Sequence, residues 1–288
     1  MYIVSLIAKP GSLDAALVSS LHGAMGGGET RLLASGEAAE FPVAEIPSNF
    51  DEIRASVADM VDLNILPAEG RRKKMLLADM DSTMIQQECI DELADEAGVG
   101  ARVKDITARA MNGELDFDGA LTERVALLKG LPEGIIDKVL AERITLMPGG
   151  KTLLATMKAQ GAYAALVSGG FTAFTEKVAA LVGFDENRAN ILHIEDGKLT
   201  GEVARPILGR EAKVEALELI TTRLGLGEDE VIAVGDGAND LGMLGRAGYG
   251  VALHAKPSVQ AQCDLRVNHG DLTALLFLQG YASDDFVA

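Results

Sequence analysis

Residues 75–83 read Met-Leu-Leu-Ala-Asp-Met-Asp-Ser-Thr, a short apolar run followed at once by carboxylates and hydroxyls. The apolar run fits a buried strand, and the turn after it places Asp79 and Asp81 at the carboxyl end of that strand. Further short apolar runs, separated by helical patterns, occupy residues 164–167, 231–234 and 250–253. Strands that alternate with helices predict a doubly wound parallel sheet of the α/β class, with its functional site at the carboxyl ends of the strands.

The two carboxylates after the first of these strands suit phosphoryl transfer. A carboxylate can attack phosphorus and form an acyl phosphate, provided that a cation neutralises charge on the transferring group. We therefore expect Asp79 to be a nucleophile. Asp81 can protonate the departing alkoxide and then take a proton from water. The alternative for this motif is an ordinary capped turn, because Asp and Ser are common turn residues.

Polar motifs also follow the later strands. The hydroxyl of Ser168 and the amides of Gly169 and Gly170 could bind phosphate oxygens, although this triplet alone could equally be a turn. Residues 235–240 read Gly-Asp-Gly-Ala-Asn-Asp, a set of carboxylates and an amide that suits a hard divalent cation. Lys213 opens a helical pattern, from which its ammonium could reach the strand ends, but a single helix lysine is usually a solvated surface residue.

The segment before the first core strand is expected to form a small unit of its own. Strands are predicted at residues 2–7, 30–35, 40–43 and 61–66, with helices beginning near Ser12 and Phe50. This βαββαβ order is similar to the ferredoxin-like ACT module. We expect a docking or dimerisation role, with a homodimer as one outcome. Residues 67–74 form a linker, so the expected domains are residues 1–70 and 74–288.

A long, mostly helical stretch separates the first two core strands. It covers about residues 86–146 and is broken by glycines, which predicts an inserted helical cap domain. Further along the chain, Asp196-Gly197 lies between residues 191–195 and 198–203. An Asp-Gly pair between apolar runs is a strong hairpin signal, so we expect a two-stranded flap there.

Composition excludes several function classes. A net charge of −17 would repel a nucleic acid backbone, and the site must therefore supply its own positive charge from a cation, Lys or Arg. The two cysteines, Cys89 and Cys263, lie far apart without CxxC spacing, which fits a reducing compartment such as the cytoplasm. The first residues lack a signal-peptide pattern, and no apolar run of about 18 residues occurs, so we expect no membrane segment.

The ordered motifs, DxDST after a strand, SGG after the next, a lysine and then GDGxND, resemble the motif set of the haloacid dehalogenase superfamily of phosphatases. The resemblance covers the chain from about Met75 to its end. It is strongest to members that act on O-phospho-L-serine, because the segment that begins Ile85-Gln86-Gln87-Glu88 resembles their cap. It implies a superfamily core with a helical cap, a small-molecule substrate, and hydrolysis through an aspartyl-phosphate on Asp79.

The resemblance also assigns roles to individual residues. It implies that Mg²⁺ is bound by Asp79, the backbone carbonyl of Asp81 and Asp236. It implies that Glu88 pairs with the substrate ammonium and Arg124 with its carboxylate. The remaining implied substrate contacts are Ser168, Gly169, Lys213 and Asn239, with Asp240 as support and Phe117 and Met111 as the apolar surface of the cap. By residue type alone, Glu88 and Arg124 would be solvated surface residues.

Two other functions are open at this point. The same chemistry could act on another small phosphorylated amino acid or metabolite. Alternatively, the chain could be a regulatory protein in which the N-terminal unit senses an amino acid and the phosphatase core is inactive.

Overall fold

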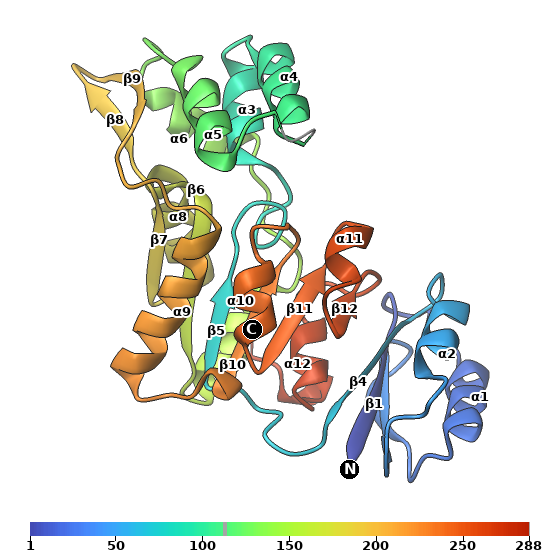
Figure 1. The fold of residues 1–288 in the computed structure, drawn as a ribbon. Coiled ribbons are helices and arrows are strands. Elements are labelled where there is room, and N and C mark those ends of the chain that lie inside the picture. Colours follow the sequence, from blue (N-terminus) through green and yellow to red (C-terminus); the bar gives the residue numbers. More distant parts are fainter. Residues whose placement is uncertain (112–113, 288) are drawn as a thin grey trace.

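The computed structural model describes residues 1–111 and 114–287, apart from the side chain of Met111. The expected place of Met111 on the cap surface therefore lies outside the described residues. Figure 1 shows a central sheet with helices around it, a group of helices beyond one end of the sheet, and the N-terminal unit to the side of the sheet, next to β12. Within the described ranges, no helix combines the length and the apolar composition needed to cross a bilayer.

The central sheet has six strands in the order β12-β11-β10-β5-β6-β7, and each neighbouring pair is parallel. Its strands are β5 (Met75–Ala78), β6 (Tyr163–Phe171), β7 (Glu186–Asn190), β10 (Val231–Gly235), β11 (Tyr249–Leu253) and β12 (Leu265–Val267). Ala78 pairs with Val234 on one side and with Leu166 on the other. The predicted doubly wound sheet is confirmed. Strand β6 continues beyond Leu166 to Phe171 and so includes Ser168, Gly169 and Gly170.

Helices cover both faces of the sheet because successive side chains of a strand point to opposite faces. Along β5, Leu76 and Ala78 join one apolar core, and Met75 and Leu77 join the other. The first core contains residues of α7 (Gly150–Ala159), α8 (Thr172–Val182) and α12 (Ala274–Leu278). The second contains residues of α9 (Arg210–Leu224), α10 (Leu241–Arg246) and the short α11 (Pro257–Gln260).

The N-terminal unit is a four-stranded antiparallel sheet in the order β2-β3-β1-β4. Its elements are β1 (Tyr2–Ile7), α1 (Ala15–Met25), β2 (Arg31–Ala34), β3 (Ala38–Val43), α2 (Phe50–Ser56) and β4 (Asp62–Pro67). Asp14 caps α1 by accepting the N–H of Ala16 at 2.8 Å. The predicted ferredoxin-like arrangement is confirmed.

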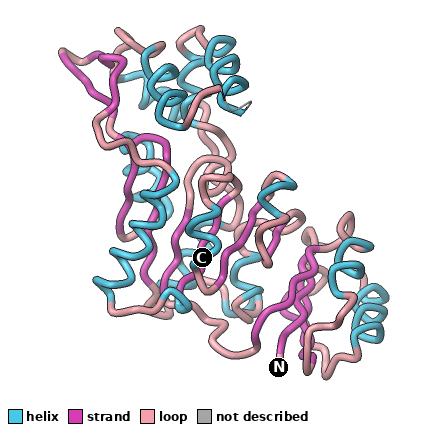
Figure 2. The backbone as a smooth tube through the Cα atoms, viewed as in Figure 1, coloured by secondary structure: helices cyan, strands magenta, loops and turns pink. Residues whose placement is uncertain are grey.

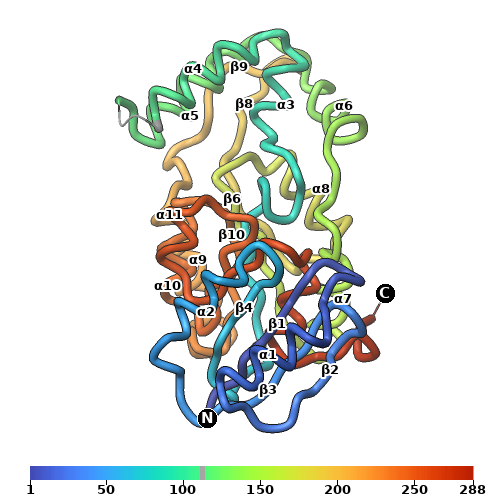
Figure 3. Tube along the Cα trace, turned by 90° about the vertical axis from the view of Figure 1, so that its right-hand side faces the viewer, coloured from blue at the N-terminus to red at the C-terminus, as the bar shows by residue number. Residues whose placement is uncertain are grey.

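The two faces of this small sheet have different neighbours. Val4, Leu6 and Phe41 belong to a core that the unit forms with its own helices. Ile7 and Leu66 belong instead to the apolar core of the parallel sheet, and β1 contacts α12. The unit is therefore packed against the rest of the protein, and Figure 3 shows the molecule from the side on which the unit lies.

The inserted segment between β5 and β6 forms the helical cap. Its helices are α3 (Cys89–Glu96), α4 (Gly100–Met111), α5 (Phe117–Ala126) and α6 (Gly134–Glu142). The chain leaves and re-enters the core side by side, since Ile85 and Leu146 form an antiparallel bridge. Figure 2 shows helices joined by loops in this part of the backbone, with a strand hairpin from another part of the chain beside them.

That hairpin consists of β8 (Leu192–Glu195) and β9 (Lys198–Val203). Asp196 and Gly197 both have positive φ, at 50° and 72°, as its tight turn requires. Lys198 forms a bridge with Pro132, and Gly201 lies so close to the cap that an added Cβ would be 2.8 Å from the Cβ of Lys129. The hairpin therefore packs on the cap, next to α5.

Candidate active site

A cavity of about 570 Å³ lies between the cap and the carboxyl ends of the central strands. The residues that sequence motifs or the family resemblance singled out and that line this cavity are Asp79, Asp81, Glu88, Phe117, Arg124, Ser168, Gly169, Asp236 and Asn239. Lys213 and Asp240 do not line it but are buried directly beside Asp79. The strand order explains this gathering, because residues at the carboxyl ends of the neighbouring strands β5, β6 and β10 meet at one edge of the sheet.

Lys213 is a buried cation at the base of the site. Its Nζ lies 2.7 Å from Oδ1 of Asp79 and 2.5 Å from Oδ1 of Asp240, and its side chain is 1% exposed. The other carboxylate oxygen of Asp240 accepts the N–H of Gly237 at 2.9 Å. Both oxygens of Asp240 are therefore engaged, and Asp240 fixes the ammonium of Lys213 against Asp79. Sequence reasoning expected a lysine that reaches over the strand ends, and the structure buries it instead.

The charges in this group depend on one another. Burial lowers the pKa of the Lys213 ammonium, but Asp79 and Asp240 raise that pKa by more, so the side chain stays protonated. Burial and the neighbouring Asp240 raise the pKa of Asp79, whereas Lys213 opposes that change. Burial, followed by Asp240 and Glu88, raises the pKa of Asp236 to about 6. The three carboxylates of Asp79, Asp236 and Asp240 outnumber the ammonium of Lys213, so a further positive charge beside them would be stabilised.

The crowded carboxylates fit a hard divalent cation. Asp79, Asp236 and Asp240 each offer an oxygen, and these oxygens lie within 4.8 Å of one another. Because Asp240 already binds Lys213 and Gly237, Asp79 and Asp236 are the members that can supply ligands. Carboxylate oxygens at a partly buried site are the donors that Mg²⁺ or Ca²⁺ prefers. Asp236 is further held by the hydroxyl of Thr83, at 3.4 Å.

Asp81 is positioned for proton transfer. Its Oδ1 accepts the backbone N–H of Cys89 at 2.9 Å, and its Oδ2 lies 3.5 Å from the hydroxyl of Ser168. Burial, and then the charge of Glu88, raise the pKa of Asp81 to about 6. A carboxyl group with this pKa can be protonated in one step and ionised in the next near neutral pH. An added Cβ on Gly170 would lie 2.8 Å from Oδ2 of Asp81, so a glycine is needed there.

The last residues of β6, from Ser168 to Gly170, are held from two sides. The hydroxyl of Ser168 accepts the N–H of Gly170 at 2.8 Å, and the side-chain amide of Asn190 donates to the carbonyl of Gly169 at 2.9 Å. From the cap, Phe117 lies so close to Gly169 that an added Cβ there would be 3.0 Å from its ring. The cap is therefore closed against this end of β6.

Two cap residues of opposite charge line the cavity. Glu88 precedes α3, and its Oε1 accepts the hydroxyl of Ser82 at 2.7 Å. Arg124 lies on α5, where its Nε donates to the carbonyl of Ala120 at 3.2 Å, and its terminal nitrogens form no hydrogen bond with the residues that the structure describes. Burial lowers the pKa of Arg124, while the carboxylates of Asp91, Glu88 and Asp81 counteract this shift. The cavity can therefore accept a ligand with both positive and negative groups.

Several lining residues were missed by sequence reasoning. Asp91, Thr107, Lys256 and Ser258 also line the cavity. Lys256 follows β11 by three residues, so the rule that sites lie at strand carboxyl ends would have included it. Asp91 and Thr107 lie on the cap helices, where no comparable rule selects individual positions.

The family model and the relatives that this chain matches point to the same family of hydrolases. Residues 76–245 match the family model of haloacid dehalogenase-like hydrolases. A phosphoserine phosphatase of Haemophilus influenzae is 48% identical over 204 residues, which cover 71% of this chain and 65% of that protein. The chain thus spans less than two thirds of the length of that relative.

Solved structures extend the likeness. A haloacid dehalogenase family hydrolase of Salmonella enterica serovar Typhi has a TM-score of 0.89 and 32% identity, covering 96% of this chain and 98% of that chain. A phosphoserine phosphatase described as a phospho-aspartyl intermediate analogue has a TM-score of 0.66 and 42% identity, covering 72% of this chain and 98% of its own. The first of these includes the N-terminal unit as well as the core.

Proposed function

Because this chain belongs to the haloacid dehalogenase-like hydrolase family, we propose that it hydrolyses O-phospho-L-serine to L-serine and phosphate, with Mg²⁺ and through an aspartyl-phosphate on Asp79. The observation that carries this proposal is the contact of the buried Lys213 ammonium with Asp79, at 2.7 Å, beside a cavity walled by Glu88 and Arg124. The reaction would be the phosphate-releasing last step of serine biosynthesis.

In the first half-reaction, a carboxylate oxygen of Asp79 attacks phosphorus and the bond to the serine oxygen breaks. Asp81 donates its proton to that oxygen, so L-serine leaves as a neutral alcohol. In the second half-reaction, the ionised Asp81 takes a proton from water, and the resulting hydroxide oxygen attacks phosphorus. Phosphate leaves, and Asp79 is regenerated as a carboxylate. One residue acts as acid and then as base, which suits the pKa of about 6 of Asp81.

The phosphoryl group needs positive charge and hydrogen-bond donors around it. Lys213, Ser168 and the amide of Gly169 are proposed to bind its oxygens. Mg²⁺ would be bound by Asp79, the backbone carbonyl of Asp81 and Asp236, with Asn239 nearby, and it would supply charge neutralisation at the phosphoryl group.

Recognition of the amino acid is assigned to the cap. Arg124 would bind the substrate carboxylate with its terminal nitrogens, and Glu88 would accept from the substrate ammonium. Phe117, which lies against Gly169, would exclude water from the reacting centre. A substrate that lacks either charged group forgoes a charge-assisted contact with Glu88 or Arg124, which costs binding free energy.

We also propose domain boundaries, a cellular location and an oligomeric state for this chain. Residues 1–70 are proposed as one domain and residues 74–288 as another, with the cap at about 86–146. A cytoplasmic location agrees with two buried free cysteines, Cys89 and Cys263.

A homodimer through the N-terminal unit is supported by Leu32, which is 60% exposed on the edge strand β2. Light scattering of the purified protein would measure its mass directly.

Phosphate release from a panel of phosphate esters tests the proposed activity. The panel comprises O-phospho-L-serine, phosphothreonine, phosphoethanolamine and glycerol phosphate, each with MgCl₂ and with EDTA. We expect phosphoserine to have the highest kcat/KM and EDTA to abolish turnover. Equal turnover of glycerol phosphate and phosphoserine would contradict the proposed substrate, and undiminished activity in EDTA would contradict the proposed metal.

A further inference from the structure

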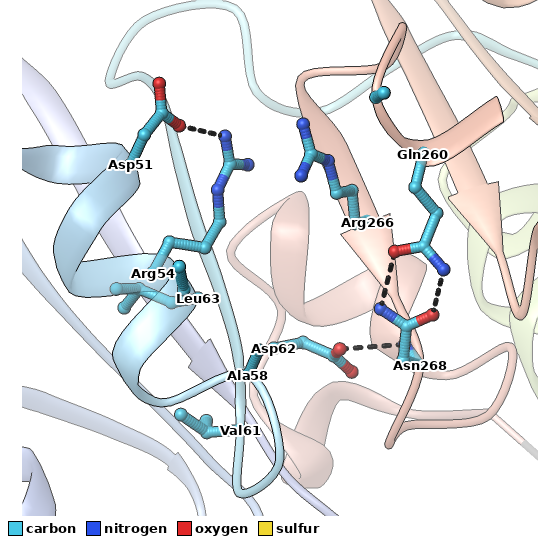
Figure 4. A pocket seen from close by; sticks show the side chains of 11 residues that line it. Asp51, Arg54, Ala58, Val61, Asp62, Leu63, Gln260, Arg266 and Asn268 are labelled. Atoms are coloured by element: carbon cyan, nitrogen blue, oxygen red, sulfur yellow. Dashed lines mark hydrogen bonds and ion pairs between the residues drawn. The ribbon is translucent and has the colours of Figure 1, made fainter. Parts of the chain in front are cut away.

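A second cavity, of about 470 Å³, lies where α2 and β4 face β12 and the end of α11. Figure 4 shows that Arg54, from the N-terminal unit, and Arg266, from the parallel sheet, extend toward one another across it. Neither residue has a role in the proposed reaction. A pair of arginines in one cavity is an arrangement that needs a physical reason.

The walls of this cavity are joined by hydrogen bonds. Asp62 accepts the backbone N–H of Asn268 at 2.7 Å and that of His269 at 2.8 Å. The side-chain amide of Asn64 accepts the N–H of Arg266 at 2.8 Å and donates to its carbonyl at 2.9 Å. These bonds connect the N-terminal unit to β12 and the loop after it, so the cavity is a preformed space between fixed walls.

Arg54 is held rigidly in one wall. Its Nη2 lies 2.6 Å from Oδ1 of Asp51, and its Nη1 donates to the carbonyl of Asp264 at 2.8 Å. The guanidinium also lies over the ring of Phe50, 5.1 Å from the centroid. Its side chain is only 15% exposed. A ligand that binds this group would not have to immobilise a flexible side chain first.

Arg266 faces Arg54 across the cavity and has hydrogen-bond donors that no described residue engages. Its Nε donates to the carbonyl of Cys263 at 3.0 Å. Its terminal nitrogens have no acceptor within residues 1–111 and 114–287. Burial lowers the pKa of Arg266, and the nearby charge of Arg54 lowers it further. Two like charges that face one another in a partly buried cavity repel, and an anion between them would replace that repulsion with two charge-assisted contacts.

The other lining residues define the class of anion. The apolar lining consists of Ala55, Ala58, Val61, Leu63 and Ala261. Asp51 and Asp62 line the cavity too, and their carboxylates would repel a doubly charged anion more strongly than a singly charged one. This lining suits a single negative charge between the arginines better than a phosphate dianion. We propose that the cavity binds a small aliphatic monocarboxylate, with its carboxylate between Arg54 and Arg266 and its hydrocarbon part on the apolar lining.

The short helix α11 connects this cavity to the active site. Lys256 and Ser258 line the active-site cavity, whereas Gln260 lines the second one. Gln260 is fixed by Asn268, with its Nε2 2.8 Å from the side-chain oxygen of that residue. A ligand beside Gln260 therefore acts on the segment that carries Lys256, and we infer that it changes the KM of the reaction. This second step rests on the proposed phosphatase function; the binding step does not.

Thermal unfolding of the full chain in EDTA tests the binding step. Sodium propionate is compared with sodium chloride at equal ionic strength, with propionamide as the neutral isostere and with sodium sulfate. We expect propionate to raise the Tm of the wild type in a saturable way, and the Arg266→Gln variant to bind it at least about tenfold more weakly. Arg102→Gln, an exposed cap arginine, is the matched control and should bind propionate as the wild type does.

Unchanged propionate binding in Arg266→Gln would overturn the site. Equal stabilisation by propionamide would overturn the ligand class, as would a saturable stabilisation by sulfate that exceeds that by propionate and is lost in Arg266→Gln, because the general effect of sulfate on Tm is neither saturable nor dependent on Arg266. If Arg266→Gln does not fold, the Ala55→Leu variant replaces it, because the leucine fills the cavity and both arginines remain. The Ala55→Leu variant must then lose the Tm shift caused by propionate.

In a separate assay with MgCl₂ and phosphoserine, propionate should change KM in the wild type and not in Arg266→Gln. An unchanged wild-type KM would overturn the coupling. Because Tm is measured without turnover, failure of the site and failure of the proposed function are distinguishable.

Discussion

The ammonium of Lys213 lies 2.7 Å from the carboxylate of Asp79, and both side chains are almost completely buried. Asp240, also fully buried, holds the other side of that ammonium at 2.5 Å. A charged group in this position is stable only while its partners remain, because an unpaired buried charge is strongly unfavourable. The same contact that stabilises the folded chain therefore places a positive charge beside the proposed nucleophile.

Replacing Lys213 by Met should affect both stability and activity. We expect the free energy of unfolding to fall by about 3 kcal/mol, since Asp79 and Asp240 lose their buried partner. We expect kcat to fall by about 10²-fold or more, because a donor to the phosphoryl oxygens is lost. Denaturant unfolding and steady-state kinetics measure these two effects. Lys151→Met, at an exposed position of α7, is the control and should change neither.

A double variant separates the two roles of this lysine. Adding Asp240→Asn to Lys213→Met removes one of the orphaned carboxylates and should restore part of the stability without restoring kcat. Recovery of activity together with stability would mean that Lys213 is only structural.

Gly170→Ala should slow the reaction by displacing Asp81. The added Cβ would lie 2.8 Å from Oδ2 of Asp81, so the carboxylate must move. A small misplacement of a reacting group costs about 10²-fold in rate. Gly245→Ala in α10, whose Cβ would meet nothing within 4 Å, is the control and should keep full activity. A wild-type kcat in Gly170→Ala would show that Asp81 is not the proton donor.

Arg124→Ala tests the assignment of the substrate carboxylate. For phosphoserine we expect kcat/KM to fall by about 10²-fold, the loss of one buried charge-assisted interaction. For phosphoethanolamine, which lacks the carboxylate, the same substitution should have little effect. Arg102→Ala, elsewhere on the cap, should change neither value. A loss of equal size for both substrates would contradict the assignment.

The metal site should make stability depend on pH in a definite direction. Burial and neighbouring charges raise the pKa of Asp81 and of Asp236 to about 6. The folded state then binds more protons than the unfolded state between about pH 4 and pH 6, so stability of the metal-free chain falls as pH rises through that window.

Magnesium binds the ionised carboxylates, and its stabilising effect should therefore increase with pH. We expect MgCl₂ to raise the Tm more at about pH 7.5 than near pH 5. The Asp236→Asn variant should lose most of that increment. An increment that is equal at both values, or larger at the lower one, would contradict a site built from these carboxylates.

Much of the core could be predicted because its signals are local. Residues 75–78 and 231–234 are uninterrupted apolar runs, as strands buried on both faces require. Strand β7, with the sequence Glu-Asn-Arg-Ala-Asn, has no such pattern and lies at an edge of the sheet, so it was not predicted. Strand β12 is only three residues long and was missed for the same lack of signal.

The positions of the site residues followed from the strand ends, whereas contacts made by tertiary packing did not. Nothing local in the sequence links Asn190 to the carbonyl of Gly169, or Arg54 to Arg266. The burial of Lys213 was also unforeseen, because a helix lysine is ordinarily exposed. These relationships depend on how the elements are placed in space, which single-sequence patterns do not encode.

Rapid acid quenching during turnover tests whether Asp79 carries the phosphoryl group, with phosphoserine that is radiolabelled in its phosphate as the substrate. We expect label bound covalently to Asp79 in the wild type, labile to hydroxylamine as acyl phosphates are, and neither label nor turnover in Asp79→Asn. Wild-type turnover rate in a clean preparation of Asp79→Asn, or label attached to any other side chain, would contradict it.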